Sequence, residues 1–361
     1  MSNYTKKILY DLSKYSLFKV DPELAHNITL NTLASAPKIA LSIYGKLKLN
    51  SIDTYEIRLN NLKFRFPVGL AAGLDKNAIA LDYFSNVGFG AVEVGTVTPL
   101  AQKGNEKPRM FRLKEELSLR NSMGFNNNGQ QSLLKNIESF PNISNIPIGI
   151  NLGKNKITKT EDAVKDYVSL FNTFKNKADY LVINVSSPNT PGLRHFEGAN
   201  GLKLILEEIC PLRDENSIPL FVKISPDIID DELKSTIDLC INKKINGLIA
   251  TNTSIQHNYS KGGVSGNIIK KQAATIRKKI LKSIENISDF DLIGVGGIDN
   301  FDDLFDFWKD GGKFVQIYTS FIYQGPQVLF NIKNEIDRYL NYYKFKNLTE
   351  LIKNIREIKK I

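Results

Sequence analysis

Cysteine, histidine and long apolar runs are all scarce in this chain. Of its 361 residues, only two are cysteine and three are histidine. Cys210 and Cys240 lie in helix-like segments without the close spacing of zinc ligands, so we expect no disulfide framework and no metal site. No run of about 18 apolar residues occurs, and the first residues lack the order of a signal peptide. We therefore expect no membrane-spanning segment and a reducing, cytosolic setting.

The basic residues of the chain are not arranged as in a nucleic-acid-binding protein. Lys and Arg number 48 against 38 Asp and Glu, a formal net charge of +10. The basic residues are scattered, and no recognisable nucleic-acid-binding motif contains them. We therefore expect no nucleic-acid partner and favour anionic small ligands or an anionic membrane surface. Apolar residues at 42% and charged residues at 24% are typical of a folded globular protein.

From residue 67 onward, short apolar runs recur, and each ends in Gly, Ser, Thr or Asn. Such runs are typical of strands buried on both faces. They are PVGLAAG at 67, AVEVGT at 91, PIGINLG at 147, YLVINVS at 180, LFVKIS at 220, GLIATNT at 247, LIGVGG at 292 and FVQIYTS at 314. Amphipathic helix patterns lie between most of them, for example at 161–176, 202–210 and 230–242. Eight such units predict an α/β fold of the (β/α)8 TIM barrel type. A doubly wound open sheet is the structural alternative.

The chain contains three further segments outside this repeat. The interval between the second and third strands is too long for a helix alone, and it predicts a hairpin and loop over the barrel mouth. Residues 1–50 predict two short helices, one capped by Thr5 and one starting after Asp21, with lysines around their apolar residues. They would form either a membrane-interface hairpin or a helical cap over the barrel bottom. Residues 341–361 predict a basic, solvated helix beyond a barrel domain at 51–340.

Polar residues follow every predicted strand, where a barrel of this type places its active site. Any one of them could simply terminate its strand. Together they bring two lysines, Lys76 and Lys223, and several carboxamides to one mouth. Glycines after the seventh strand and Tyr318-Thr319 after the eighth occupy the usual phosphate position, so we expect a phosphorylated ligand. The carboxamides match the edges of a small cyclic imide or urea.

Nine motifs in order give the chain a family resemblance from about residue 15 to 339. They are GLAAGLDKN, EVGTVTP, GNEKPRMFR, MGFNNNG, INVSSPNTPGLR, ATNTS, GGVSG, IGVGGI and VQIYTSFIYQGP. This set resembles the dihydroorotate dehydrogenases, the flavin enzymes of pyrimidine synthesis. In that family, soluble class 1 enzymes carry a catalytic cysteine, whereas membrane-associated class 2 enzymes carry serine and an N-terminal helical extension. Ser187 and residues 1–50 resemble class 2.

The resemblance implies an FMN cofactor over the barrel mouth and a set of residues that contact it. These are Ala72, Gly73, Leu74, Asp75, Lys76, Thr96, Asn151, Asn184, Lys223, Thr251, Gly266, Gly297, Tyr318 and Thr319. It assigns to Lys223 the neutralisation of charge on the reduced isoalloxazine. A structural ion pair is the alternative role of this lysine.

The resemblance likewise implies dihydroorotate as substrate, orotate as product and Ser187 as the catalytic base. The implied substrate contacts are Lys76, Asn121, Ser122, Met123, Gly124, Phe125, Asn184, Asn189, Asn252 and Thr253. A serine hydroxyl needs activation to act as a base near neutral pH, and the sequence does not identify the activating group. Ser122 stands where many class 2 relatives have arginine, and we expect activity to survive this departure.

A quinone acceptor is the remaining implication of class 2. His26 and Arg112 match positions that line the quinone tunnel in the family, which favours the membrane role of residues 1–50. We expect a monomer attached peripherally to the cytoplasmic face of the inner membrane. Two alternatives stay open at this point: a class 1-type soluble enzyme that uses fumarate or NAD, and a non-catalytic flavin-binding barrel.

Overall fold

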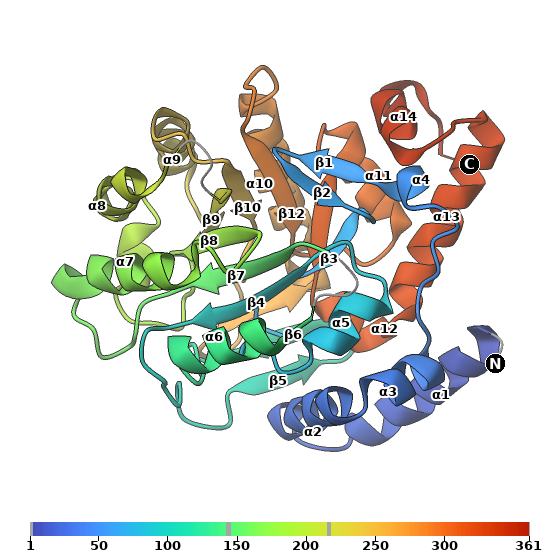
Figure 1. The fold of residues 1–361 in the computed structure, drawn as a ribbon, viewed down its shortest axis with the longest axis horizontal. Coiled ribbons are helices and arrows are strands. Elements are labelled where there is room, and N and C mark those ends of the chain that lie inside the picture. Colours follow the sequence, from blue (N-terminus) through green and yellow to red (C-terminus); the bar gives the residue numbers. More distant parts are fainter. Residues whose placement is uncertain (1–2, 142–145, 215–217, 361) are drawn as a thin grey trace.

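A closed barrel of eight parallel strands forms the centre of the computed structural model, which describes residues 3–141, 146–214 and 218–360 (Figure 1). In chain order the strands are β3 (Val68–Leu70), β4 (Val92–Val97), β7 (Ile148–Leu152), β8 (Tyr180–Asn184), β9 (Leu220–Ile224), β10 (Gly247–Ala250), β12 (Asp291–Val295) and β13 (Phe314–Ile317). All eight predicted strands are confirmed. Pairing of β13 with β3 closes the sheet, which excludes the doubly wound alternative.

Helices follow the barrel strands along the chain, and most of them bury an apolar face. They are α5 (Leu81–Val87), α6 (Gln130–Ser139), α7 (Ala163–Phe174), α8 (Ala199–Ile209), α9 (Asp230–Asn242), α10 (Lys270–Ser283), α11 (Phe301–Lys309), α12 (Thr319–Gln324) and α13 (Gln327–Tyr343). In α9 the buried residues Leu233, Thr236, Ile237 and Cys240 follow the spacing of a single helix face. The helices predicted at 161–176, 202–210 and 230–242 correspond to α7, α8 and α9.

The predicted insertion after the second barrel strand is a hairpin of β5 (Met110–Leu113) and β6 (Ser118–Asn121). A third strand, β11 (Gly263–Gly266), pairs antiparallel with β6 and was not expected from the sequence. It comes from the loop after β10. Segments more than a hundred residues apart therefore form one small sheet at the mouth of the barrel.

A different hairpin closes the bottom of the barrel. It consists of β1 (Ile57–Leu59) and β2 (Leu62–Phe64), preceded by the short α4 (Ile52–Tyr55). The Phe64 ring stacks on Phe314 at the start of β13, with ring centroids 4.0 Å apart. The Asn60 backbone N–H donates to the Asp291 carboxylate at the start of β12 over 2.9 Å. The alternative of an N-terminal helical cap over the barrel bottom is therefore wrong.

The N-terminal helices α1 (Asn3–Leu17), α2 (Pro22–Ser35) and α3 (Pro37–Tyr44) lie beside α5, α12 and the mouth hairpin (Figure 1). Helix α2 begins as predicted, with the Asp21 carboxylate accepting from two backbone N–H groups of its first turn. Thr5 lies inside α1, so its prediction as a cap is wrong.

A buried ion pair holds α2 against the mouth of the barrel. The Arg109 guanidinium donates two hydrogen bonds to the Glu23 carboxylate, at 2.6 and 3.0 Å, and both side chains are buried. Arg109 also donates to the backbone oxygens of Lys103 and Asn105. The Asn105 side chain in turn donates to the oxygens of Ser122 and Asn189. Helix α2 is therefore connected to the predicted substrate loops.

The C-terminal segment packs on the barrel. Its elements are α14 (Leu348–Lys353) and the 3-10 turn η5 (Ile355–Glu357), and the predicted boundary at 340 falls inside α13. Leu348, Leu351, Ile355 and Ile358 are buried. The segment is thus divided into two short elements with a buried apolar face, whereas its lysines are exposed, as expected for a basic, solvated face. None of the helices in the described ranges combines the length and apolar character needed to traverse a membrane.

Candidate active site

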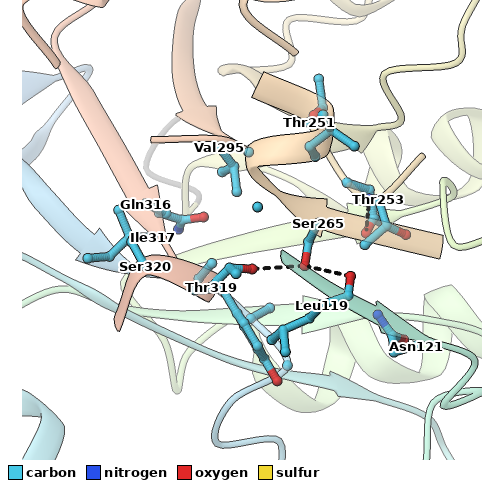
Figure 2. Close-up of a pocket in the computed structure, with 18 of the residues that line it drawn as sticks. Leu119, Asn121, Thr251, Thr253, Ser265, Val295, Gln316, Ile317, Thr319 and Ser320 are labelled. Carbon is cyan, nitrogen blue, oxygen red and sulfur yellow. Dashed lines mark hydrogen bonds between the residues drawn. The ribbon is translucent and has the colours of Figure 1, made fainter. Parts of the chain in front are cut away.

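The carboxyl ends of the barrel strands surround a cavity of about 330 Å³, and the mouth hairpin with β11 covers one side of it (Figure 2). Most of the predicted site residues line this cavity. They are Ala72, Gly73, Lys76, Thr96, Asn121, Met123, Gly124, Phe125, Asn184, Ser187, Asn189, Lys223, Thr251, Asn252, Thr253, Gly266, Gly297, Tyr318 and Thr319. The structure thus brings together residues that are spread over some 250 positions of the chain.

Four predicted residues do not line the cavity. Leu74 borders a second cavity, and the buried Asp75 carboxylate accepts from the backbone N–H groups of Ile79 and Ala80. The Asp75 side chain thus stabilises its own turn, and burial raises its pKa to about 6. The Ser122 backbone N–H donates to the Arg109 backbone oxygen, and the Ser122 backbone oxygen accepts from the Asn105 side-chain amide. The Asn151 carboxamide oxygen accepts from Thr96 and Asn184, and its amide donates to Glu93.

A network of carboxamides forms the floor of the cavity. The Asn184 amide donates to Asn151 over 2.8 Å and to the Thr96 hydroxyl over 3.0 Å. Asn252 donates to the Ser186 hydroxyl over 3.0 Å. Because these donors and acceptors satisfy one another, the side chains are held in fixed orientations before any ligand arrives.

Two lysines bring positive charge to the cavity. Burial, together with the nearby Arg109 charge, lowers the pKa of Lys76 to about 8, so this amine is mostly protonated at neutral pH. Its Nζ donates to the Asn126 carboxamide oxygen. Burial also lowers the pKa of Lys223, and the Glu93 carboxylate opposes this shift. Both cations are available to an anionic ligand.

Sequence reasoning missed Glu93 and Gln316. Both residues lie inside strands, and both are fully buried. The Gln316 amide donates to the Glu93 carboxylate over 2.7 Å, and Gln316 also lines the cavity. The sequence did contain a signal, since a carboxylate and a carboxamide each interrupt a run that is otherwise apolar. Because an unpaired charge is rarely buried, Glu93 could have been expected to have a polar partner inside the barrel.

One wall of the cavity combines buried polar atoms with a tightly packed glycine. The Thr251 hydroxyl and the Gln316 carboxamide oxygen line it and, among the described residues, have no hydrogen-bond partner. A buried polar atom without a partner is costly unless a ligand or water satisfies it. At Gly297, where φ is +69°, a Cβ would lie 2.4 Å from the Lys270 Cα. Ser265 and Thr319 exchange a hydrogen bond of 2.8 Å at the same end (Figure 2).

Ser187 lies in this cavity in the loop after β8. It is buried, with 6% of its surface exposed, and its Oγ accepts from the Asn189 backbone N–H over 3.3 Å. Asn189 in turn donates to the backbone oxygen of Asn121 in β6. The serine is therefore placed by both the barrel and the mouth hairpin, in a pocket with little access for bulk water.

A second cavity of about 490 Å³ lies between the N-terminal helices and the barrel. Its lining is mostly apolar and includes His26 and Arg112, the two predicted tunnel residues. The Arg112 guanidinium donates to the backbone oxygens of Val20 and Leu17 at the turn between α1 and α2. Lys14, Met110, Leu119 and Tyr318 line both cavities, so the two adjoin.

His26 is expected to be neutral throughout the physiological pH range. Burial, and secondarily the Lys76 charge, lower its pKa from 6.5 to about 4. The unfolded chain then binds the proton more tightly, so the contribution of His26 to stability is present above pH 6.5 and lost as the pH falls through about 4. An NMR titration of the three histidines, assigned with a His26→Gln variant, measures this pKa directly. Titration of His26 between pH 6 and 7 would contradict the expectation.

Comparisons with known proteins agree with this geometry. The model of the dihydroorotate dehydrogenase family matches residues 55–340. A protein named dihydroorotate dehydrogenase (quinone) from Idiomarina loihiensis is 39% identical over 343 residues, or 91% of this chain and 100% of the relative. One from Christiangramia forsetii is 40% identical, over 90% of this chain and 97% of the relative. A crystal structure of the Eimeria tenella enzyme with ferulenol has a TM-score of 0.81 at 33% identity, covering 93% of this chain and 94% of that one.

Proposed function

The chain belongs to the dihydroorotate dehydrogenase family, and from that premise we propose that it oxidises (S)-dihydroorotate to orotate in de novo pyrimidine synthesis. Bound FMN would supply the hydride acceptor at the barrel mouth, and a membrane quinone would be the final electron acceptor. One observation carries the proposal: the cavity lined by Lys76, Ser187 and Lys223 adjoins a second, more apolar cavity beside the N-terminal helices.

The substrate is held by residues on the mouth side of the cavity. Lys76 provides positive charge for the carboxylate, and the loop from Asn121 through Ser122, Met123 and Gly124 to Phe125 closes over the ring. The carboxamides of Asn184, Asn189 and Asn252, with Thr253, bind the edges of the pyrimidine ring. The Ser187 Oγ accepts the proton from C5 as hydride leaves C6. Exclusion of bulk water by the surrounding loops keeps that proton transfer within the site.

The FMN site is proposed on the opposite wall of the same cavity. The glycines at 296 and 297 and the Tyr318-Thr319 pair, which line this part of the cavity, would bind the phosphate end. Ala72, Gly73, Thr96 and Thr251 would hold the ring end, and the Thr251 hydroxyl has no other hydrogen-bond partner among the described residues. Lys223 compensates the negative charge that the ring system gains on reduction.

Two observations favour a quinone over fumarate or NAD as the acceptor. Serine rather than cysteine occupies position 187, and the apolar cavity provides a separate approach to the flavin site. His26 and Arg112 bind the quinone in this cavity. A soluble class 1-type enzyme would not need this cavity, because fumarate and NAD are polar and can reach a flavin site without passing through an apolar cavity.

Membrane attachment through the N-terminal helices is part of the proposal. Large apolar side chains are exposed on α1, α2 and α3, namely Ile8, Leu12, Tyr15, Leu24, Ile28 and Ile39. Lysines of the same segment can contact anionic headgroups, as in other interfacial helices. The protein is then a monomer attached peripherally to the cytoplasmic face of the inner membrane, with the second cavity near the lipid.

Parallel assays with several electron acceptors test the proposed function. The purified protein should show a yellow flavin spectrum, release FMN on denaturation, and oxidise dihydroorotate with a soluble quinone analogue much faster than with fumarate or NAD. Removal of the flavin should abolish turnover, and FMN but not free riboflavin should restore it because the phosphate is bound. Turnover with fumarate but not with quinone would contradict the class 2 assignment, and absence of bound flavin would overturn the function itself.

A further inference from the structure

Glu93 is a buried carboxylate beneath the flavin site to which the proposed mechanism gives no role. It lies in β4 with no exposed surface. The Asn151 amide donates to its Oε1 over 2.8 Å, and the Gln316 amide donates to its Oε2 over 2.7 Å. The Tyr180 hydroxyl lies 3.5 Å from Oε2. Each of these neighbours presents a donor, so the acceptor-only, ionised form of the carboxylate fits this site.

The Lys223 amine is the cation that offsets this buried charge. Its Nζ lies 3.9 Å from the Glu93 Oε1, and both side chains are almost completely removed from solvent. Solvent screens the electric field of two such buried charges only weakly, because the local dielectric constant is low. Any group in the cavity above them therefore experiences the pair, and loss of either member would change the potential there strongly.

Glu93 also determines which way the Gln316 carboxamide faces. Because an ionised carboxylate accepts and cannot donate, it requires the nitrogen of Gln316 on its side. The same nitrogen donates to Tyr180 over 3.1 Å. Within the described part of the chain the Gln316 oxygen has no hydrogen-bond partner, and Gln316 lines the cavity, where Figure 2 shows it beside Val295 and Ile317. A ligand with a donor group would satisfy it.

We propose that Glu93 is a positioning residue that compensates the charge of Lys223, orients Gln316 toward the bound flavin, and so sets the reduction potential of that flavin. This inference rests on the proposed function, since it requires a flavin in the cavity. The negative charge of Glu93 disfavours the anionic reduced ring, and the positive charge of Lys223 favours it. The pair thus keeps the potential between the values that either charge alone would produce.

Flavin midpoint potentials of charge variants test the proposal. The FMN-bound proteins Glu93→Gln, Lys223→Gln and the double variant are titrated anaerobically against a reference dye at pH 6, chosen to keep the Lys223 amine protonated. Glu93→Gln should shift the ratio of reduced to oxidised flavin tenfold or more toward reduced, about 30 mV for a two-electron couple. Lys223→Gln should shift it in the opposite direction. The double variant, which restores neutrality, should return to within about threefold of the parent.

Two further variants separate charge from packing. Tyr180→Phe removes the hydroxyl that contacts Glu93 and Gln316 without changing charge, and it should shift the potential much less than Glu93→Gln does. Glu93→Asp keeps the charge on a shorter side chain and should stay close to the parent. A Glu93→Gln potential within about twofold of the parent ratio overturns the proposal while leaving the proposed function intact, and equal shifts in Glu93→Gln and Glu93→Asp overturn it as well. Protein without bound flavin would overturn both proposals, and the flavin absorbance of each preparation shows which case applies.

Discussion

Replacing Ser187 with alanine should slow the reduction of the bound flavin by dihydroorotate about 10²-fold or more. This is the lower range of what a positioned acid or base contributes to a rate. The Oγ is buried in the cavity and held by a backbone N–H of its own loop. Among the described residues its only hydrogen bond is that one, so the hydroxyl keeps its hydrogen and a second lone pair for the substrate. Stopped-flow absorbance of the flavin under anaerobic conditions measures this half-reaction separately from quinone turnover.

The controls for Ser187 distinguish loss of a base from loss of a site. Ser235→Ala makes the same chemical change at an exposed position on α9 and should leave flavin reduction unchanged. Orotate binding, followed by its effect on the flavin spectrum, should be nearly the same in Ser187→Ala and in the parent. Near-normal flavin reduction in Ser187→Ala would remove Ser187 from the role of base. Weakened orotate binding with a matching loss of rate would assign it to substrate binding instead.

The barrel strands and the strand-end residues could be predicted because both follow from local sequence. A parallel strand covered on both faces is an uninterrupted apolar run, and the residue that ends it is where the chain reaches the mouth. Ser187 and Lys223 were placed correctly in the cavity on this basis. A motif match, however, predicts where a segment lies but not which way each of its side chains points. Asp75 belongs to a matched motif, yet its carboxylate faces its own backbone.

Features that depend on long-range packing could not be predicted from local patterns. Strand β11 pairs with β6 across more than a hundred residues, and nothing in Gly263–Gly266 itself specifies that partner. The β1 and β2 hairpin closes the bottom through contacts with the starts of β12 and β13. Glu93 and Gln316 lie within strands, and their shared position inside the barrel follows from register rather than from strand ends. The hydrogen bond between Glu93 and Gln316 could therefore not be predicted from either strand alone.

A bulky side chain in the second cavity should separate the two halves of the reaction. Thr29 lies on α2 and lines this cavity. Thr29→Trp is expected to reduce quinone turnover tenfold or more, because the indole would occupy space that the quinone needs. Reduction of the flavin by dihydroorotate should stay within about twofold of the parent, since no residue of the substrate loops changes. Steady-state assays with a quinone analogue and stopped-flow flavin reduction measure the two rates in the same preparation.

The helix itself supplies the matched control for Thr29→Trp. Asn27 is exposed on α2 and does not line the cavity, so Asn27→Trp adds the same bulk without blocking the route and should leave both rates unchanged. Deletion of residues 1–45 is a less specific test, because it would also remove Glu23 and leave the buried Arg109 without its ion-pair partner. Arg109 donates to Asn105, which in turn donates to Asn189, so the deletion would also disturb the substrate loops. Equal losses of quinone turnover and flavin reduction in Thr29→Trp would mean that α2 supports the barrel rather than a quinone route. A loss confined to quinone turnover would place the acceptor in the second cavity.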